Sequence, residues 1–217
     1  IAEDAVNFFQ NMLMGDLYSS YQKLLVAPFT MKDHLLRMID GEIARGQKGY
    51  IIIKVNSVTE RELIDKLVQA SQAGVRVELI VRGICCLIPG LPGVSENITV
   101  YSIVGQLLEH SRIFKFENAG NPKIYMGSAD WMPRNLERRV EILFPVEDPK
   151  LKEKVLRILD VQLRDTVKAH LLQPDGSYEK VDRRGKETFN SQVAFCVEAM
   201  EAAKAQETPH DDRVFIP

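Results

Sequence analysis

The sequence predicts an α/β fold in which helices flank a mixed β-sheet. Two apolar runs rich in β-branched residues, 50–55 and 75–81, are separated by an amphipathic segment of helical length. Such a strand–helix–strand unit is a crossover connection, so its two strands should lie parallel. The turn-rich segment 118–122 then joins two further apolar runs into a hairpin, which adds antiparallel strands.

Composition and charge narrow the class of protein. The chain has 217 residues, is 45% hydrophobic and carries a formal net charge of −2. It can bury one substantial core and is not a generally basic nucleic-acid binder, so an anion site requires local clustering of cations. No apolar run approaches the roughly eighteen residues that span a bilayer, and the first residues do not form a signal peptide. Three cysteines with neither framework spacing nor a Cys-x-x-Cys pair favour a reducing cytosol and argue against a zinc site.

The N-terminal elements follow from hydrophobic periodicity and turn residues. A helix is expected over 2–13, broken at Gly15, and a short strand over 24–27. Helical periodicity resumes at Thr30 and stops near Gly46. The first residue is Ile rather than Met, so we expect a longer parent chain.

The crossover helix and the remaining elements are placed in the same way. Thr59-Glu60-Arg61-Glu62 matches a capping box, which starts a helix that ends near Gly74. Further strands are expected over 98–104, 113–117, 123–127 and 139–144. A long amphipathic helix over 151–169, a polar loop over 173–189, a helix over 190–205 and a polar tail complete the chain.

One histidine and several arginines gather between residues 109 and 139. Arginine offers a planar fork of donors that matches phosphate oxygens, and histidine is well suited to exchange a proton near neutral pH. The small-residue turn Gly127-Ser128 has backbone N–H groups that can approach an anion. The histidine is His110, and the arginines are Arg112, Arg134, Arg138 and Arg139. The segment therefore predicts a phosphate-binding site with a catalytic histidine.

A further cation, Arg82, follows the strand over 75–81. Ligands of open α/β sheets gather at the carboxyl ends of strands, so Arg82 is expected to join the same site. Successive strand residues face opposite sides of a sheet, and we expect Arg139 rather than Arg138 to face the ligand.

Carboxylates and a histidine near these cations have both functional and structural interpretations. Glu109 or Glu117 could orient the imidazole of His110. A lone histidine beside a strand is more often a surface residue or a hydrogen-bonded core residue than a catalytic one. Asp130 could cap the turn that leads to Asn135 instead of contacting a ligand.

These residues resemble a degenerate phospholipase D signature. That signature combines His-x-Lys, an Asp further along and a downstream Gly-Ser. Here Arg112 stands in place of the Lys, and Glu117, five residues further on, stands in place of the Asp. The Gly-Ser is Gly127-Ser128, after a longer gap.

Longer segments resemble the C-terminal part of polyphosphate kinase, and the likeness covers nearly the whole chain. The segments are Ile43-Ala44, Lys54–Ser57, Leu79–Cys85, Leu87–Gly90, Ser102–Gly105, Leu108–Arg112, Ser128–Asn135 and Asp165–Ala169. The resemblance implies a phospholipase-D-like α/β domain with C-terminal helices. It also implies an enzyme that moves the terminal phosphate of ATP onto polyphosphate and back, through a phosphohistidine on another domain.

The resemblance assigns roles to particular residues. In this family two phospholipase-D-like domains form one tunnel, and His110 matches the histidine of the second. Arg82 matches an arginine that contacts nucleotide phosphates, and Arg139 matches one that lines the phosphate path. Mg²⁺ accompanies the nucleotide, and none of its ligands is expected in this chain. Supporting roles are expected for Glu109, Glu117, Gly127, Ser128, Asp130 and Asn135.

The Thr-His-x-Lys segment of the family's first catalytic domain is absent from the chain. We therefore expect 1–20 to be the tail of a preceding catalytic domain or a linker, 21–172 the phospholipase-D-like domain, and 173–217 a C-terminal loop, helix and tail. The chain alone should lack kinase activity, because upstream domains of the same polypeptide complete the site. The resemblance also implies a homo-oligomeric full-length protein in the cytoplasm, including its membrane surface.

Two other functions are compatible with the same residues. The first is a phospholipase-D-like phosphodiesterase or nuclease, against which Arg112 in place of Lys speaks. The second is a non-catalytic module that binds polyanions or mediates oligomerisation.

Overall fold

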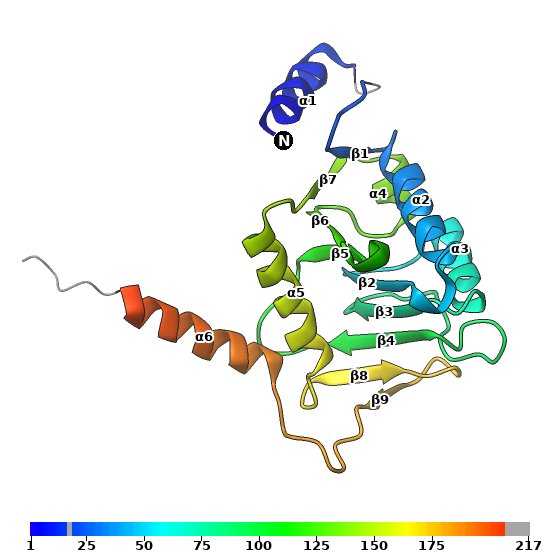
Figure 1. Ribbon diagram of the computed structural model, residues 1–217, viewed down its shortest axis with the longest axis vertical. Helices are drawn as coiled ribbons and strands as arrows, with labels where there is room; N and C mark the ends of the chain where they lie inside the picture. Colours follow the sequence, from blue (N-terminus) through cyan, green and yellow to red (C-terminus); the bar gives the residue numbers. More distant parts are fainter. Residues whose placement is uncertain (17–18, 207–217) are drawn as a thin grey trace, which may run out of the picture.

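The computed structural model describes residues 1–16 and 19–206, and its strands form a single sheet (Figure 1). Neighbouring strands follow the order β1-β7-β6-β5-β2-β3-β4-β8-β9. In that order their bounds are Leu25–Ala27, Glu141–Pro145, Lys123–Gly127, Arg112–Phe116, Tyr50–Val55, Arg76–Val81, Ile98–Ile103, Ala169–Leu172 and Tyr178–Lys180. The predicted class, a mixed sheet flanked by helices, is confirmed.

Strand pairing follows the predicted crossover and hairpin. β2 pairs with β3 in parallel, with Tyr50 opposite Arg76, and β3 pairs with β4 in parallel. β5 returns antiparallel to β2 and pairs antiparallel with β6 through the predicted hairpin. As a result the carboxyl ends of β2, β3, β4 and β6 and the amino end of β5 reach the same edge of the sheet.

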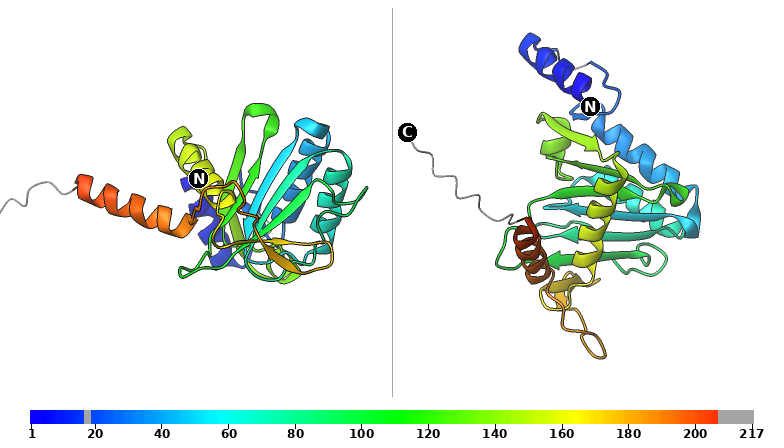
Figure 2. Two further views of the ribbon diagram at one scale, coloured as in Figure 1. Left: turned by 90° about the horizontal axis from the view of Figure 1, so that it is seen from below. Right: turned by 60° about the vertical axis from the view of Figure 1, so that its left-hand side comes forward.

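Helices cover both faces of the sheet. Their bounds are α1 Ala2–Met14, α2 Met31–Ile43, α3 Arg61–Gln72, α4 Pro133–Glu137, α5 Pro149–Leu163 and α6 Ser191–Gln206. Helices α2 and α3 pack together on one face, and α5 lies across the other (Figures 1 and 2). The alternating side chains of β2 therefore enter two cores, with Ile51 and Ile53 facing α2 and α3 and Ile52 facing α5.

The predicted capping box at Thr59 does not form. Helix α3 begins at Arg61 after an extended Glu60, and no side chain caps it. The backbone N–H groups of Thr59 and Glu60 both donate to the carbonyl oxygen of Trp131, at 2.7 and 2.9 Å. The Glu60 carboxylate instead pairs with Lys32, at 2.7 Å. A tertiary contact has replaced the local one that the sequence pattern predicts.

The predicted helix over 151–169 is too long. Helix α5 ends at Leu163 because the buried Asp165 carboxylate accepts hydrogen bonds from the N–H groups of Val167 and Lys168, at 2.8 and 2.6 Å. This side chain offers those backbone groups an alternative to the helix. The chain then enters β8, and β9 lies within the segment 173–189 that we expected to be a loop.

Two short elements near the site also differ from expectation. The chain forms α4 after Met132, with Pro133 at its first position, and the following strand begins at Glu141 rather than at residue 139. Pro at this position is preorganised for a helix start, but no helix was predicted here from the sequence. The alternation argument for Arg138 and Arg139 does not apply, because neither residue lies in a strand.

The N-terminal helix is attached through one carboxylate and one aromatic ring. Asp4 accepts hydrogen bonds from the N–H groups of Gln22, Lys23 and Leu24, at 3.0, 2.6 and 2.9 Å. Phe8 packs with Leu24 and with β1. The division at residue 20 stays a prediction, and the polar tail after α6 lies outside the described residues.

Among the helices that the structure describes, none is both long and apolar enough to cross a membrane.

Replacing Asp165 with Asn should test how much this carboxylate stabilises the fold. Burial alone would raise the pKa of Asp165, but hydrogen bonds from Ser191, Lys168 and Val167 lower it below its usual value. A lowered folded-state pKa stabilises the protein above the unfolded pKa of about 3.9, and this contribution is lost as pH falls through the folded pKa. Asp165→Asn should therefore reduce the free energy of unfolding by about 1–3 kcal/mol at pH 7 and weaken its acid dependence.

Urea unfolding of the chain at several pH values measures both effects. Asp175→Asn is the matched control, because Asp175 also binds nearby backbone but is exposed. Equal acid dependence in Asp165→Asn and the parent chain would contradict the prediction.

Candidate active site

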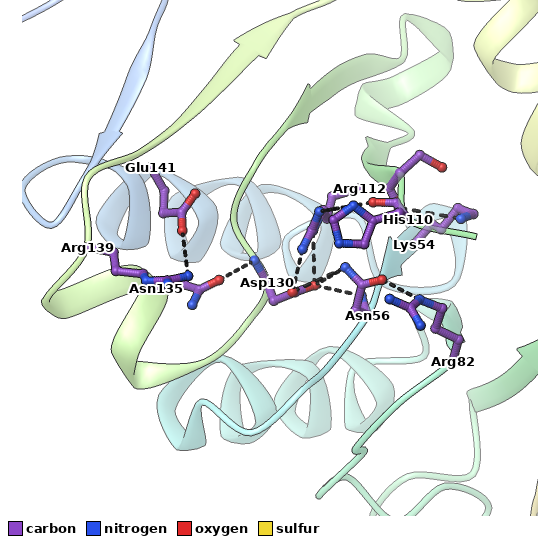
Figure 3. Close-up of polar contacts among 10 residues, drawn as sticks. Lys54, Asn56, Arg82, His110, Arg112, Asp130, Asn135, Arg139 and Glu141 are labelled. Carbon is purple, nitrogen blue, oxygen red and sulfur yellow. Dashed lines mark hydrogen bonds and ion pairs between the residues drawn. The ribbon is translucent and has the colours of Figure 1, made fainter. Parts of the chain in front are cut away.

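Polar side chains from several strand ends meet at one edge of the sheet. Asn56 follows β2, Arg82 follows β3, and His110 precedes β5, whose first residue is Arg112. Figure 3 shows these four side chains on one side of Asp130, which follows β6. The edge is the one predicted from the carboxyl ends of the parallel strands.

The Asp130 carboxylate is the centre of a hydrogen-bond network. Arg112 donates to it twice, from Nη2 to Oδ2 at 2.8 Å and from Nε to Oδ1 at 3.3 Å. Asn56 donates from its backbone N–H at 2.6 Å and from its side-chain amide at 3.0 Å. The Arg112 and Asp130 side chains are only 13% and 10% exposed, which makes this a largely buried ion pair.

The network fixes the charge of Asp130. Burial alone would raise the pKa of this carboxyl, but hydrogen bonds from Arg112 and Asn56 lower it below its usual value. Asp130 is therefore an anion at neutral pH whose two oxygens are already occupied. It is poorly suited to act as a proton acceptor or metal ligand, and its role is to orient Arg112 and Asn56.

Asn56 links this hydrogen-bond network to Arg82. Its side-chain oxygen accepts from Nε of Arg82 at 2.5 Å, while its amide nitrogen donates to Asp130. The other guanidinium nitrogens of Arg82 have no hydrogen-bond partner among the described residues. Arg82 thus presents the outer part of its fork to a ligand.

Arg112 also sets the orientation of the exposed His110. Its Nη1 lies 3.3 Å from Nδ1 of the imidazole and donates to the His110 carbonyl oxygen at 3.0 Å. A guanidinium can only donate, so this contact requires Nδ1 to be the unprotonated nitrogen and places the proton of a neutral imidazole on Nε2. The free nitrogen of His110 is then a hydrogen-bond donor.

Neither predicted carboxylate contacts the imidazole, and the interpretation that one of them orients it is wrong. Glu109 accepts hydrogen bonds from Gln162 and Gln192 and pairs with Lys54 at 3.3 Å. Glu117 lies beyond the other end of β5, where it pairs with Lys115. Because β5 runs from Arg112 to Phe116, its length separates Glu117 from the site.

The Gly-Ser turn supports strand pairing. A Cβ atom on Gly127 would overlap the Ile142 carbonyl oxygen and lie 2.7 Å from Cδ2 of Leu143, so only glycine fits beside β7. Ser128 donates its N–H to the Ile142 carbonyl at 3.1 Å, and its hydroxyl accepts from the Ile142 N–H at 3.2 Å. The Ser128 amide is therefore already occupied, contrary to our expectation that it would bind an anion.

Arg139 lies on the other side of Asp130 from His110. Arg139 is exposed and lies 3.8 Å from Glu141 (Figure 3), and Arg134 is exposed on α4. His110 and Arg139 do not precede neighbouring strands, because β6 lies between β5 and β7. Asn135 accepts from the Asp130 N–H at 3.0 Å, so the capping contact runs opposite to the one predicted.

Several residues that organise the site have no role predicted from the sequence. Asn56 could have been found, because it is the first polar residue after the β2 run, as Arg82 is after β3. Lys54 is the one charge within that run. No local pattern indicates Gln162 or Gln192, which reach Glu109 from distant parts of the chain.

The described residues contain no group of three or more His, Cys, Asp or Glu side chains arranged to hold a metal ion.

Comparison with known proteins places the chain in a family. The family model described as polyphosphate kinase C-terminal domain 2 matches residues 24–192. The chain belongs to the polyphosphate kinase family. Over an alignment of 208 residues it is 48% identical to the polyphosphate kinase of Lactiplantibacillus plantarum. This alignment covers 93% of the chain and 29% of that relative.

Solved structures support the family and the fold. The crystal structure of polyphosphate kinase from Porphyromonas gingivalis matches 92% of the chain and 31% of its own, with a TM-score of 0.85 and 37% identity. Nuc, a phospholipase D family member from Salmonella typhimurium, matches 70% of the chain and 97% of its own, with a TM-score of 0.53 and 16% identity. The second likeness concerns fold alone and confirms the phospholipase-D-like architecture. The chain spans less than a third of the length of the polyphosphate kinases that it matches.

Replacing Asp130 with Asn should destabilise the domain. The new amide would face the Arg112 guanidinium and leave its charge without a counterion, so we expect a loss of about 3 kcal/mol in the free energy of unfolding. Denaturant titration at pH 7 measures this loss. Asp182→Asn is the control, because its pair with Arg184 is exposed and should contribute little. Equal stability of the two variants would contradict a structural role for Asp130.

Proposed function

We propose that this chain is the second catalytic domain of an ATP–polyphosphate phosphotransferase. The enzyme reversibly transfers the terminal phosphate of ATP to polyphosphate through a phosphohistidine on another domain. The observation that carries the proposal is the meeting of Arg82, His110 and Arg112 at one sheet edge, held by Asn56 and Asp130. The family assignment agrees with it.

The cations of the site differ in their availability. Arg112 is neutralised by Asp130, so its contribution is to hold His110. Arg82 keeps donors free for a phosphate, and Arg134, Arg138 and Arg139 add exposed charge in the segment that follows Asp130. Phosphoryl transfer depends mainly on positioning and charge neutralisation, and a row of arginines can supply both to a polyphosphate chain.

His110 is suited to donate a proton or a hydrogen bond. With Nδ1 held by Arg112, the imidazole presents Nε2–H to the ligand side. This tautomer is poorly suited to attack phosphorus, since its free nitrogen is protonated. It can protonate a leaving phosphate oxygen or stabilise the charge that develops as the phosphohistidine forms and breaks down.

Mg²⁺ would accompany the ATP. The Asp130 oxygens are saturated by Arg112 and Asn56, so this carboxylate does not fit the metal. The metal would be held by the nucleotide phosphates and by groups outside this site. A full-length enzyme of this kind would act in the cytoplasm, where ATP is available.

The proposal is tested with the full-length protein, ATP labelled on its terminal phosphate, and Mg²⁺. We expect long-chain polyphosphate and an acid-labile phosphohistidine, with neither product when the 217-residue chain is used alone. A stable phosphohistidine at His110 of the chain alone would contradict the assignment. Hydrolysis of a phosphodiester by the full-length protein, without polyphosphate, would favour a phosphodiesterase.

His110→Ala in the full-length enzyme should reduce polyphosphate synthesis by a factor of about a hundred to ten thousand, the usual contribution of general acid–base catalysis. The exposed ring makes few packing contacts, so the melting temperature should change little. His34→Ala is the matched control, since the Nδ1 of His34 also lies near an arginine, Arg37 at 2.9 Å, but on α2. Inactivity explained by a large fall in melting temperature would point to a structural role instead.

Arg82→Lys should weaken ATP binding at least several-fold, although the charge is kept. Lysine cannot both replace the Nε donor to Asn56 and present a fork to phosphate. Isothermal titration at increasing salt should also show affinity falling as the attraction is screened. Arg76→Lys, at the other end of β3, should bind ATP normally. Equal affinities of the two variants for ATP would show that Arg82 is not part of the ATP-binding site.

A further inference from the structure

The segment 104–111, which joins β4 to β5 and carries His110, has no helix or strand of its own. Six of its eight residues are exposed, including Leu107 and Leu108. Such a loop would be expected to move unless specific contacts hold it.

Resting on the proposed function, we propose that Gln192, in the first turn of α6, is a positioning residue that clamps this loop and thereby sets the place of His110.

Both the oxygen and the nitrogen of the Gln192 side-chain amide form hydrogen bonds with the loop backbone. The oxygen accepts from the Leu107 N–H at 3.0 Å, and the nitrogen donates to the Leu107 carbonyl at 2.8 Å. The same nitrogen donates to Glu109 at 3.1 Å. Gln192 is only 5% exposed, so these bonds are shielded from water. The amide thus pairs with the loop as a strand neighbour would.

The loop sequence leaves room for this amide. A Cβ atom on Gly105 would overlap the Gln192 oxygen and lie 2.7 Å from its Cδ atom. Glycine is therefore required at 105 for the clamp to close, although its backbone does not have a positive φ.

The first turn of α6, which carries Gln192, is held by contacts that do not involve the loop. Asp165 accepts from the N–H and hydroxyl of Ser191, at 2.8 and 2.7 Å, and Ser191 is fully buried. Asn190 accepts from the N–H groups of Gln192 and Val193, at 3.1 and 3.3 Å. These contacts hold the first turn of α6 against the end of α5.

Buried groups secure the loop on both flanks of His110. The other Glu109 oxygen accepts from Gln162 at 2.6 Å and pairs with Lys54 at 3.3 Å. Lys54 also donates to the Ser111 carbonyl at 3.4 Å. The residues immediately before and after His110 are therefore tied to β2, α5 and α6, while the imidazole itself stays exposed.

The first test measures the loop directly in the full-length protein. Gln192→Met keeps the volume of the side chain and removes its hydrogen bonds. Hydrogen exchange followed by mass spectrometry should show at least tenfold faster exchange in 104–111, with 98–103 unchanged. Val193→Ala, at an exposed position of the same helix turn, is the matched control. Unchanged protection of 104–111 in Gln192→Met would overturn the clamp.

The second test asks whether the clamp acts through catalysis. Gln192→Met, assayed well below its melting temperature, should lower kcat at least tenfold with KM for ATP nearly unchanged, because the clamp holds the loop of His110 and not Arg82. Val193→Ala should leave kcat and KM at their normal values. An unchanged kcat in Gln192→Met, or a fall in kcat that disappears when the assay temperature is lowered further, would overturn the positioning role. Absence of polyphosphate synthesis by the unmodified enzyme would overturn the proposed function instead, while the exchange experiment would still decide whether the clamp exists.

Discussion

One carboxylate, that of Asp130, joins strand ends that are far apart in the sequence. It binds Asn56, which is 74 positions away, and Arg112, which is 18 positions away. The backbone N–H of Asp130 donates to the side chain of Asn135. A buried carboxylate without such donors would be strongly destabilising, so the folded state has to bring all of these groups to it. The geometry of the edge follows, because Asn56 orients Arg82 and Arg112 orients His110.

The loop after β6 is rigid because it is anchored in the core. Trp131, next to Asp130, is fully buried and stacks on Phe114 with ring centroids 6.1 Å apart. Its carbonyl oxygen receives the two N–H groups that precede α3. On the surface above, Lys32 pairs with Glu60, Glu62 and Glu137 and so links α2, α3 and α4. Rigid support of this kind is what positioning of phosphate groups requires.

Local patterns predicted the parts of the fold that local forces decide. The apolar run over 50–55 gave the bounds of β2, and the turn at 118–122 gave the β5–β6 hairpin. Arg82 was expected at the ligand edge because it follows a parallel strand, and His110 and Arg112 were expected at the same site because they lie close together in the sequence. Arg139, which was also expected there, lies on the other side of Asp130 (Figure 3). Where a tertiary contact competes with a local one, the prediction was wrong. The Trp131 carbonyl oxygen accepts the Thr59 N–H that a capping box would use, and Asp165 ends α5 earlier than predicted.

The contacts that hold His110 could not be predicted, because their signals are not local. Gln192 and Leu107 are 85 positions apart, and no spacing rule relates a helix-turn glutamine to a loop backbone. Glu109 was expected to be one of two carboxylates that could orient the imidazole, but its partners are two glutamines and a lysine. There is a physical reason why Glu109 does not contact His110. If Glu109 contacted His110, its charge would favour the imidazolium and compete with the anionic ligand for the ring N–H. Directing Glu109 toward buried donors holds the loop and leaves the exposed ring beside Arg112, which agrees with the proposed role of His110 as a donor to a phosphate oxygen.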